Sequence, residues 1–304
     1  MRLLFAGTPA VAVPSLEALA ARHEIVAVVT RLDAPLGRKR VLTPSPVAVA
    51  AEELGLPVLK ANRLDAELTA RIAELDADLG VIVAYGGLVR EPLLSTPRLG
   101  WINLHFSLLP RWRGAAPVQW SVIAGDSETG ATVFQLAPGL DDGEVWSMSS
   151  TPIGGNETAG NLLGRLSHSG AEQLAATVDG IGSGALQRAA QVGDVTLAPK
   201  LGIEDARLDF TADLEVVYRR LRGVTPEPGA FTEIDGLRVK VLDAAPARDR
   251  PRLEPGVIVG EGRQVFVGTA SAPLELLTVQ PAGKKPMNAA DWWRGTGAES
   301  MVAR

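Results

Sequence analysis

The chain has 304 residues, of which 46% are hydrophobic and 21% are charged, a composition typical of a globular protein with one large domain or two. It has no cysteine, which excludes disulfides, thiolate nucleophiles and cysteine-ligated metals. With only three histidines, far apart in the chain, we expect no metal site. Without a signal peptide or an apolar run of ~20 residues, we expect a cytoplasmic protein with no membrane contact.

The first half of the chain alternates apolar runs with amphipathic stretches. Apolar strands separated by helices predict a mostly parallel sheet that is covered on both faces. Ligands bind such sheets outside the carboxyl ends of the strands. We expect strands at 2–7, 24–30, 57–60, 78–85, 100–107, 132–135 and 145–149, and helices at 15–22, 47–54, 65–75, 116–124 and 157–178.

The pattern changes in the second half. Residues 181–205 are Gly-rich and irregular, which indicates a linker. After a helix at 211–223, Asp235-Gly236 predicts a hairpin. Five short strands with turns between them fit a small oligonucleotide-binding (OB) type barrel, although a sandwich would give the same pattern. These strands are expected at 230–234, 237–242, 256–259, 264–269 and 274–278.

One strand end carries candidate catalytic residues. Asn103 and His105 are two positions apart, so their side chains leave the same face of the strand. An amide that binds an oxygen and an imidazole that moves a proton suit chemistry at a carbonyl. Asp141 or Asp142 could supply a carboxylate from another loop, and the residues alone do not choose between them.

Other loops at this edge have two interpretations each. The insertion at about 31–45 carries Arg31, Arg38, Lys39 and Arg40; it is either a solvated loop or a contact for phosphate or RNA. Residues 83–87 could offer backbone groups to a heterocycle or form a simple turn. Residues 7–9 lack the spacing of a dinucleotide or ATP motif, so we expect a tight turn there.

These motifs resemble the 10-formyltetrahydrofolate-dependent formyltransferases. The basic insertion, the Arg111–Pro117 run and the strand-rich second half resemble the members that act on tRNA. The matching segments are Phe5–Pro9, Ala34–Arg38, Pro44–Val47, Val83–Gly86, Asn103–Pro117, Gly139–Gly143, Pro226–Ala230 and Gln280–Lys285. Departures from the family pattern occur at Ala10-Val11, Gly87, Arg90 and Thr225-Pro226-Glu227.

The resemblance implies a fold and an activity. It implies a Rossmann-like α/β formyltransferase domain at 1–182, a linker at 183–206 and an OB-like tRNA-binding β-barrel at 207–304. It implies transfer of the formyl group of 10-formyltetrahydrofolate to the α-amino group of methionine on initiator tRNA. We expect a monomer that uses no metal. The alternatives are formyl transfer to the amine of a sugar nucleotide or a ribonucleotide, and a non-catalytic RNA-binding protein.

The resemblance also assigns residues. Asn103, His105 and Asp141 take the catalytic positions, since Asp141 precedes the x-Gly step of the family motif. Arg38 matches an arginine that contacts tRNA, and Lys39, Arg40, Lys284 and Lys285 extend the predicted tRNA site. Arg219, Arg220 and Arg222 could join them in one basic track. The predicted folate-binding residues are Val83, Tyr85, Gly86, Ser107, Leu108, Leu109 and Pro110.

Overall fold

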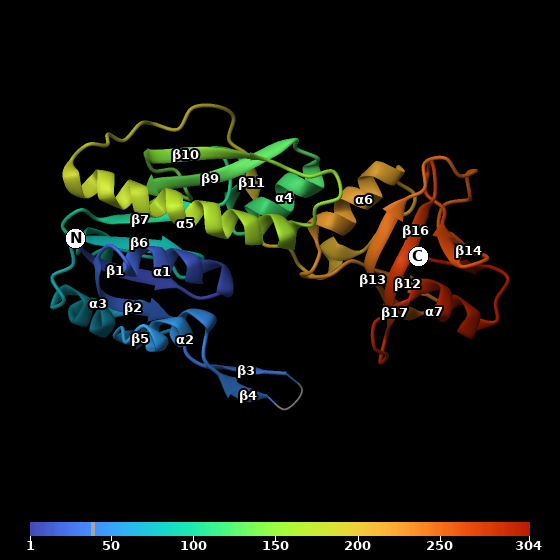
Figure 1. Ribbon diagram of the computed structural model, residues 1–304, viewed down its shortest axis with the longest axis horizontal. Coiled ribbons are helices and arrows are strands. Elements are labelled where there is room, and N and C mark those ends of the chain that lie inside the picture. Colours follow the sequence, from blue (N-terminus) through green and yellow to red (C-terminus); the bar gives the residue numbers. More distant parts are fainter. Residues whose placement is uncertain (38–39) are drawn as a thin grey trace. The chain divides into compact units, whose positions relative to one another are not determined.

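The computed structural model describes residues 1–37 and 40–304 (Figure 1). The chain divides into two compact units, and neither is one continuous stretch. The first unit comprises Met1–Pro117, Glu128–Pro152 and Leu163–Ala198, and the second comprises Val118–Ser127, Ile153–Leu162 and Pro199–Arg304.

A seven-stranded sheet forms the centre of the first unit. Its strand order is β10-β9-β7-β6-β1-β2-β5, and the five strands from β7 to β5 are parallel. Strands β9 and β10 are antiparallel additions at one edge. The mostly parallel sheet predicted from the sequence is confirmed. The strands are β1 (Arg2–Gly7), β2 (Glu24–Thr30), β5 (Val58–Lys60), β6 (Leu79–Val83), β7 (Trp101–His105), β9 (Glu128–Gln135) and β10 (Val145–Pro152).

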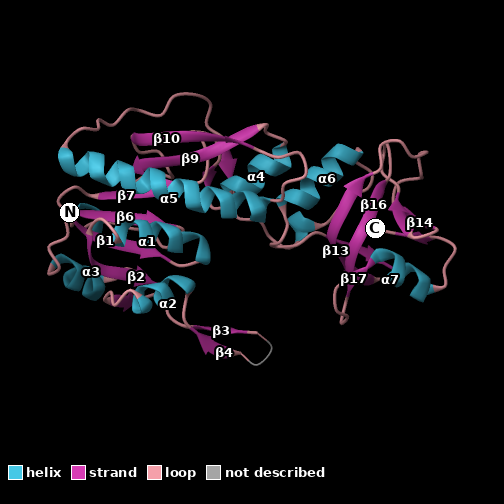
Figure 2. Ribbon diagram, viewed as in Figure 1, coloured by secondary structure: helices cyan, strands magenta, loops and turns pink. Residues whose placement is uncertain are grey.

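Helices cover both faces of this sheet (Figure 2). Leu4 of β1 shares a core with Ile72 of α3 and with Trp101 of β7. Leu104 of β7 points to the opposite face, where it lies close to Gly170 of α5. The helices are η1 (Ala10–Ala12), α1 (Val13–Ala20), α2 (Pro46–Glu53), α3 (Ala66–Ala73), η2 (Leu93–Ser95) and α5 (Ala159–Ser183).

The basic insertion contains an antiparallel hairpin of β3 (Ala34–Leu36) and β4 (Val41–Thr43), where the sequence suggested a loop. Arg38 and Lys39 lie outside the described residues. Just after the hairpin, Ser45 caps α2 by accepting a hydrogen bond from the Ala48 amide at 3.0 Å. Its hydroxyl also lies 2.6 Å from that of buried Thr30, at the end of β2. The insertion therefore leaves and rejoins the unit at one buried point.

Part of the segment expected as a linker is hydrogen-bonded to the first unit. β11 (Leu197–Ala198) pairs in parallel with β8 (Arg113–Gly114). Ala189 forms a bridge with Val145 at the start of β10. This segment consequently takes part in the fold of the first unit.

The second unit contains an antiparallel sheet that closes on itself. Its strands run in the order β12-β13-β16-β15-β14-β18, and β17 pairs with β16. Beyond β18, Ala303 forms a bridge with Ile234 of β12. This closure selects the predicted barrel over a sandwich. The strands are β12 (Phe231–Ile234), β13 (Leu237–Pro246), β14 (Val257–Glu261), β15 (Gln264–Val267), β16 (Leu274–Pro281), β17 (Met287–Asn288) and β18 (Met301–Val302).

Helices pack around this barrel, and one of its arginines is buried. The helices are α4 (Pro117–Ala124, in this unit from Val118 on), η3 (Glu204–Ala206), α6 (Leu214–Gly223) and α7 (Ala289–Thr296). Arg222 of α6 is 8% exposed and donates to the carbonyls of Gly154 at 3.2 Å and Glu157 at 3.1 Å. The prediction that Arg222 joins a basic surface track is therefore wrong, because its guanidinium is used inside the unit.

Within the described part of the chain, no helix combines the length and the apolar character that crossing a membrane requires.

Candidate active site

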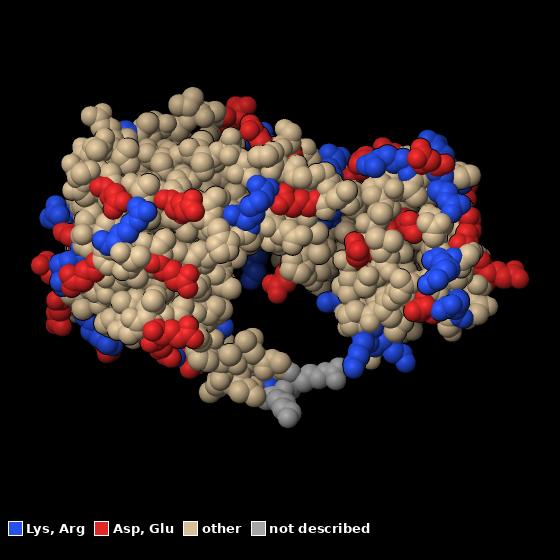
Figure 3. Space-filling view, in the orientation of Figure 1, with Lys and Arg blue, Asp and Glu red and all other residues tan. Residues whose placement is uncertain are grey.

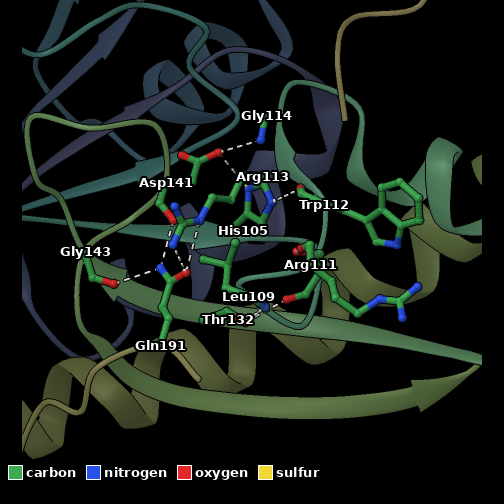
Figure 4. A network of polar contacts seen from close by, with 11 residues as sticks. His105, Leu109, Arg111, Trp112, Arg113, Gly114, Thr132, Asp141, Gly143 and Gln191 are labelled. Atoms are coloured by element: carbon green, nitrogen blue, oxygen red, sulfur yellow. Dashed lines mark hydrogen bonds and ion pairs between the residues drawn. The ribbon is translucent and has the colours of Figure 1, made fainter. Parts of the chain in front are cut away.

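His105 is the last residue of β7 and is 6% exposed. Its Nε2 lies 2.9 Å from the carbonyl oxygen of Trp112 (Figure 4). A carbonyl only accepts hydrogen bonds, so Nε2 carries the proton in the neutral ring. The other ring nitrogen, Nδ1, lies 3.8 Å from Oδ2 of Asp141. In the neutral imidazole, the unprotonated Nδ1 therefore faces the carboxylate of Asp141.

The pKa of His105 lies below its ordinary value. Burial is the main cause, because a charged imidazolium loses its hydration inside the protein. The Asp141 carboxylate and the hydrogen bond to Trp112 act in the opposite direction but do not outweigh burial. The resting imidazole is consequently neutral at neutral pH and can take up a proton.

Asp141 is held in a turn that gives its carboxylate one orientation. Its backbone has φ of 46°, a left-handed conformation that is rare outside glycine. The Gly114 amide donates to its Oδ2 at 2.8 Å, the same oxygen that faces His105. Asp142, by contrast, is exposed. The structure thus brings Asp141 to the imidazole, where the residue types alone left the choice open.

Asn103 lies two positions before His105 in β7 and is half-buried. Its register partners are Ile82 of β6 and Phe134 of β9. Residues two apart in a strand share a face. The strand register therefore puts Asn103 and His105 on the same face of β7, as the spacing predicts.

The segment from Ser107 to Pro110 is fixed by a buried hydroxyl that the sequence analysis missed. Thr132 lies opposite His105 in β9 and donates to the Ser107 carbonyl at 2.6 Å. Its oxygen accepts the Leu109 amide at 3.2 Å. A fully buried threonine beside the apolar pair Val133-Phe134 was the available signal. Leu108 remains half-exposed and can offer an apolar surface.

Residues 84–87 follow β6, where the sequence predicted either backbone groups for a heterocycle or a simple turn, and Ala84 and Gly86 are exposed there. Val83 is fully buried, and the Tyr85 hydroxyl donates to the Ala61 carbonyl at 3.3 Å. At position 87 a Cβ would come within 2.4 Å of the Tyr85 ring. The departure from the family pattern at Gly87 thus has a local reason, since the ring occupies the space of any side chain there.

Gln191 also escaped the sequence analysis. Its side-chain amide contacts Arg113 and the backbone of the turn that carries Asp141. Gln191 lies in an irregular Gly-containing segment, where sequence gives no periodic signal. Figure 4 shows Gln191 between these two loops.

The predicted tRNA-binding residues fall in both units. Arg40 is exposed in the β3–β4 hairpin, and its neighbours Arg38 and Lys39 are outside the described residues. Lys284 and Lys285 are exposed in the turn between β16 and β17. Figure 3 shows basic side chains at this edge of the second unit.

Among the residues that the structure describes, no three His, Asp or Glu side chains are arranged to hold a metal ion. His23 instead faces Asp179, with Nε2 3.2 Å from Oδ1. The expectation of metal-independent chemistry stays a prediction.

Comparisons with solved structures show the same fold. An N-formyltransferase from Helicobacter canadensis, solved in complex with folinic acid and dTDP-3-aminofucose, has a TM-score of 0.70 at 17% identity, over 90% of this chain and 97% of that one. A HypX variant from Aquifex aeolicus has a TM-score of 0.69 at 17% identity, over 97% of this chain and 47% of that one. These identities establish the fold alone.

Sequence comparisons establish the family. The family model described as "Formyl transferase" matches residues 1–178, and the model described as "Formyl transferase, C-terminal domain" matches residues 200–297. The methionyl-tRNA formyltransferases of Clavibacter sepedonicus and Leifsonia xyli subsp. xyli are 61% and 60% identical to this chain, and each match covers 100% of both chains. The chain therefore belongs to the formyl transferase family, in which these full-length relatives are methionyl-tRNA formyltransferases.

Proposed function

We propose that this protein transfers the formyl group of 10-formyltetrahydrofolate to the α-amino group of methionine on initiator tRNA. The observation that carries the proposal is the match to methionyl-tRNA formyltransferases over the whole chain, both domains included. The alternative, formyl transfer to a sugar nucleotide, is supported only by solved structures whose low sequence identity to this chain establishes the fold and not the substrate.

The acceptor amine needs little activation. A free α-amino group has a pKa of about 7.7–8.0, so roughly a tenth to a sixth of it is already neutral and nucleophilic at pH 7. The difficult part is the negative charge that develops on the formyl oxygen, together with the movement of protons between nitrogens. Asn103 donates a hydrogen bond to that oxygen.

His105 moves the proton. Its Nδ1 accepts the proton that the attacking amine loses, because the ring is neutral and its Nε2–H is engaged by Trp112. Asp141, 3.8 Å from Nδ1, stabilises the imidazolium that results. His105 then releases the proton to the leaving nitrogen, which returns the site to its starting state.

The loops beside this pair suit a folate. Bound 10-formyltetrahydrofolate supplies a formyl group already activated for transfer to an amine. Ala84 and Gly86, both exposed, can offer main-chain amide and carbonyl groups to a heterocycle, and half-exposed Leu108 can offer an apolar contact. Strands β6 and β7 are parallel neighbours, so both loops leave the same edge of the sheet.

Binding of the tRNA falls to local basic groups, since the chain has a net charge of −5. Arg38, Lys39 and Arg40 of the insertion and Lys284 and Lys285 of the barrel contact tRNA phosphates. The protein acts as a monomer in the cytoplasm, where charged tRNA is found.

The test is formyl transfer with the purified protein, 10-formyltetrahydrofolate and charged initiator Met-tRNA. Uncharged initiator tRNA and a dTDP-amino sugar serve as parallel acceptors. We expect N-formylmethionyl-tRNA as the product and no product from the other two. Formylation of the sugar in preference to Met-tRNA would overturn the proposal, and tRNA binding with no transfer would favour the RNA-binding alternative.

A further inference from the structure

The Gln191 side chain uses both ends of its amide. Its Nε2 donates to the carbonyls of Asp141 at 2.8 Å and Gly143 at 2.9 Å. Its Oε1 accepts from Arg113, at 3.2 Å from Nε and 2.7 Å from Nη2. These partners also assign the Oε1 and Nε2 atoms of the Gln191 amide, because the Arg113 guanidinium only donates hydrogen bonds and the two carbonyls only accept them.

These contacts join the two loops that hold the His105–Asp141 pair. Arg113 lies between Trp112, whose carbonyl accepts from His105, and Gly114, whose amide donates to Asp141. The other loop carries Asp141 itself, in a left-handed backbone conformation that few non-glycine residues adopt. Gln191 thus ties the imidazole loop to the backbone of the carboxylate loop, beside the Gly114–Asp141 hydrogen bond (Figure 4).

We infer that Gln191 is a positioning residue, which holds the Asp141 turn so that its carboxylate faces Nδ1 of His105, and that Arg113 orients the Gln191 amide. The inference rests on the proposed function, since it assumes that the His105–Asp141 pair carries the reaction. Gln191 itself has no part in binding substrate.

Two substitutions distinguish the hydrogen bonds of the Gln191 Nε2 from those of its Oε1. Gln191→Met removes every hydrogen bond at similar volume. Gln191→Glu keeps an acceptor for Arg113 but sets a carboxylate oxygen against the carbonyls of Asp141 and Gly143. Both variants should lose about 10- to 100-fold in kcat, the effect of misplacing a reacting group, with both KM values within about twofold. Normal kcat in Gln191→Glu would mean that the Asp141 turn does not need Gln191.

A matched control lies on α5. Gln173 donates to the Ala131 carbonyl at 3.2 Å and to the Ser147 hydroxyl at 3.0 Å, and accepts from Ser149 at 2.6 Å. Gln173→Met removes a similar set of bonds from the same unit without touching the Asp141 turn. It should leave kcat unchanged. An equal loss of kcat in Gln173→Met and Gln191→Met would mean that both act through general stability.

The closing experiment measures the His105 titration by NMR in the full-length protein without substrates. The chain has only three histidines, which makes assignment by substitution practical. In the described part of the chain, the charge acting on His105 is that of Asp141. Asp141→Asn should therefore lower the pKa of His105 in the wild-type background and change it little in Gln191→Met.

An equal drop in both backgrounds would overturn the inference, because Asp141 would then hold its place without Gln191. Since this titration needs neither tRNA nor folate, it stands apart from the proposed function. A protein that formylates no tRNA but shows the coupling would refute the function and keep the positioning role of Gln191.

Discussion

Opposing effects act on the pKa of His105. Burial favours its neutral form, while Asp141 and the Trp112 carbonyl favour the charged one, and burial is the larger effect. A base that is neutral at rest yet has a carboxylate at hand can gain a proton briefly and lose it again. This balance suits a group that passes one proton between two nitrogens.

Loss of either member of the pair should slow turnover. His105→Ala and Asp141→Asn should each lower kcat by at least ~10²-fold, the usual effect of removing an acid–base group or its partner. KM for tRNA and for folate should change little, because neither side chain is expected to supply much binding energy. Steady-state kinetics with each substrate varied would test this, and near-normal turnover would remove that residue from the mechanism.

The pH dependence follows from the direction of the pKa shift. His105 acts in its neutral form, so kcat should fall as the pH drops through its pKa, which lies below the ordinary 6.5. In the unfolded chain the histidine binds its proton at higher pH, so stability should also fall as the pH drops below about 6.5. A pH–rate profile and melting curves would measure both effects. The acceptor amine adds its own acid limb near its pKa of ~7.7–8.0, so the effect of His105 is a further fall of kcat below pH 6.5. The same further fall in His105→Ala would contradict the assignment.

Spacing alone predicted Asn103 and His105, because alternation along a strand is a local rule. Asp141 needed the family resemblance, since its approach to His105 depends on how two loops fold. Gln191 was not predicted at all. Its role comes from contacts across 50 positions of sequence, and no local pattern encodes them.

Among the secondary-structure elements, the β3–β4 hairpin is attached to the first unit through Ser45, whose contacts should contribute to stability. Ser45 caps α2 and lies against Thr30 in a fully buried pair of hydroxyls. Ser45→Ala removes the cap and leaves Thr30 with a lost partner, so we expect a loss of about 1–3 kcal/mol in the free energy of unfolding. Asp65 caps α3 at a more exposed position, and Asp65→Ala should cost about 1 kcal/mol. Denaturant titration of both variants would test the difference, and equal losses would contradict the buried role of Ser45.

The hairpin should act on tRNA and not on folate. Replacing Arg38, Lys39 and Arg40 with Gln should raise KM for tRNA several-fold, because each arginine or lysine that meets a phosphate contributes counterion release. The control replaces Arg71 and Arg98 with Gln. Arg71 lies in the last turn of α3 and Arg98 pairs with Asp78 just before β6, at the opposite edge of the sheet. Unchanged KM for tRNA in the triple variant would exclude the insertion from the tRNA site.

Elements with a clear apolar pattern were predicted, whereas β3, β4, β17, β18 and α7 were not. The sequence indicated β12 to β16, yet α7 was missed. Eight residues that include two tryptophans and a glycine give a weak helical pattern. Packing of Trp293 close to Gly260 of the barrel stabilises this helix, and that contact is invisible in the local sequence.

Considered as a whole, the chain passes between its units more than once. Residues 118–127 and 153–162 belong to the second unit, although they precede the expected linker. Ile123 packs against the barrel's hydrophobic core, close to Gly223 of α6. Deleting the residues after 205 would uncover these apolar surfaces, so charge substitutions test the barrel's role better than truncation does.

Binding of tRNA should depend on salt. If Lys284 and Lys285 each neutralise a phosphate, replacing both with Gln should flatten the plot of log K against log salt by ~0.7–0.9 per contact. Folate binding should not change. Filter binding of initiator tRNA at several salt concentrations would measure the slope, and an unchanged slope would show that these lysines are ordinary surface charges.

The closure of the barrel bears on how the protein folds. Its seam joins Thr232 to Arg304, which are 72 positions apart, by a hydrogen bond at 3.0 Å. Contacts between such distant residues form slowly, because a long loop must lose its freedom before the contact is made. We expect the seam to form after the folding transition state, so that Thr232→Val, which removes this hydrogen bond, accelerates unfolding and leaves the refolding rate nearly unchanged.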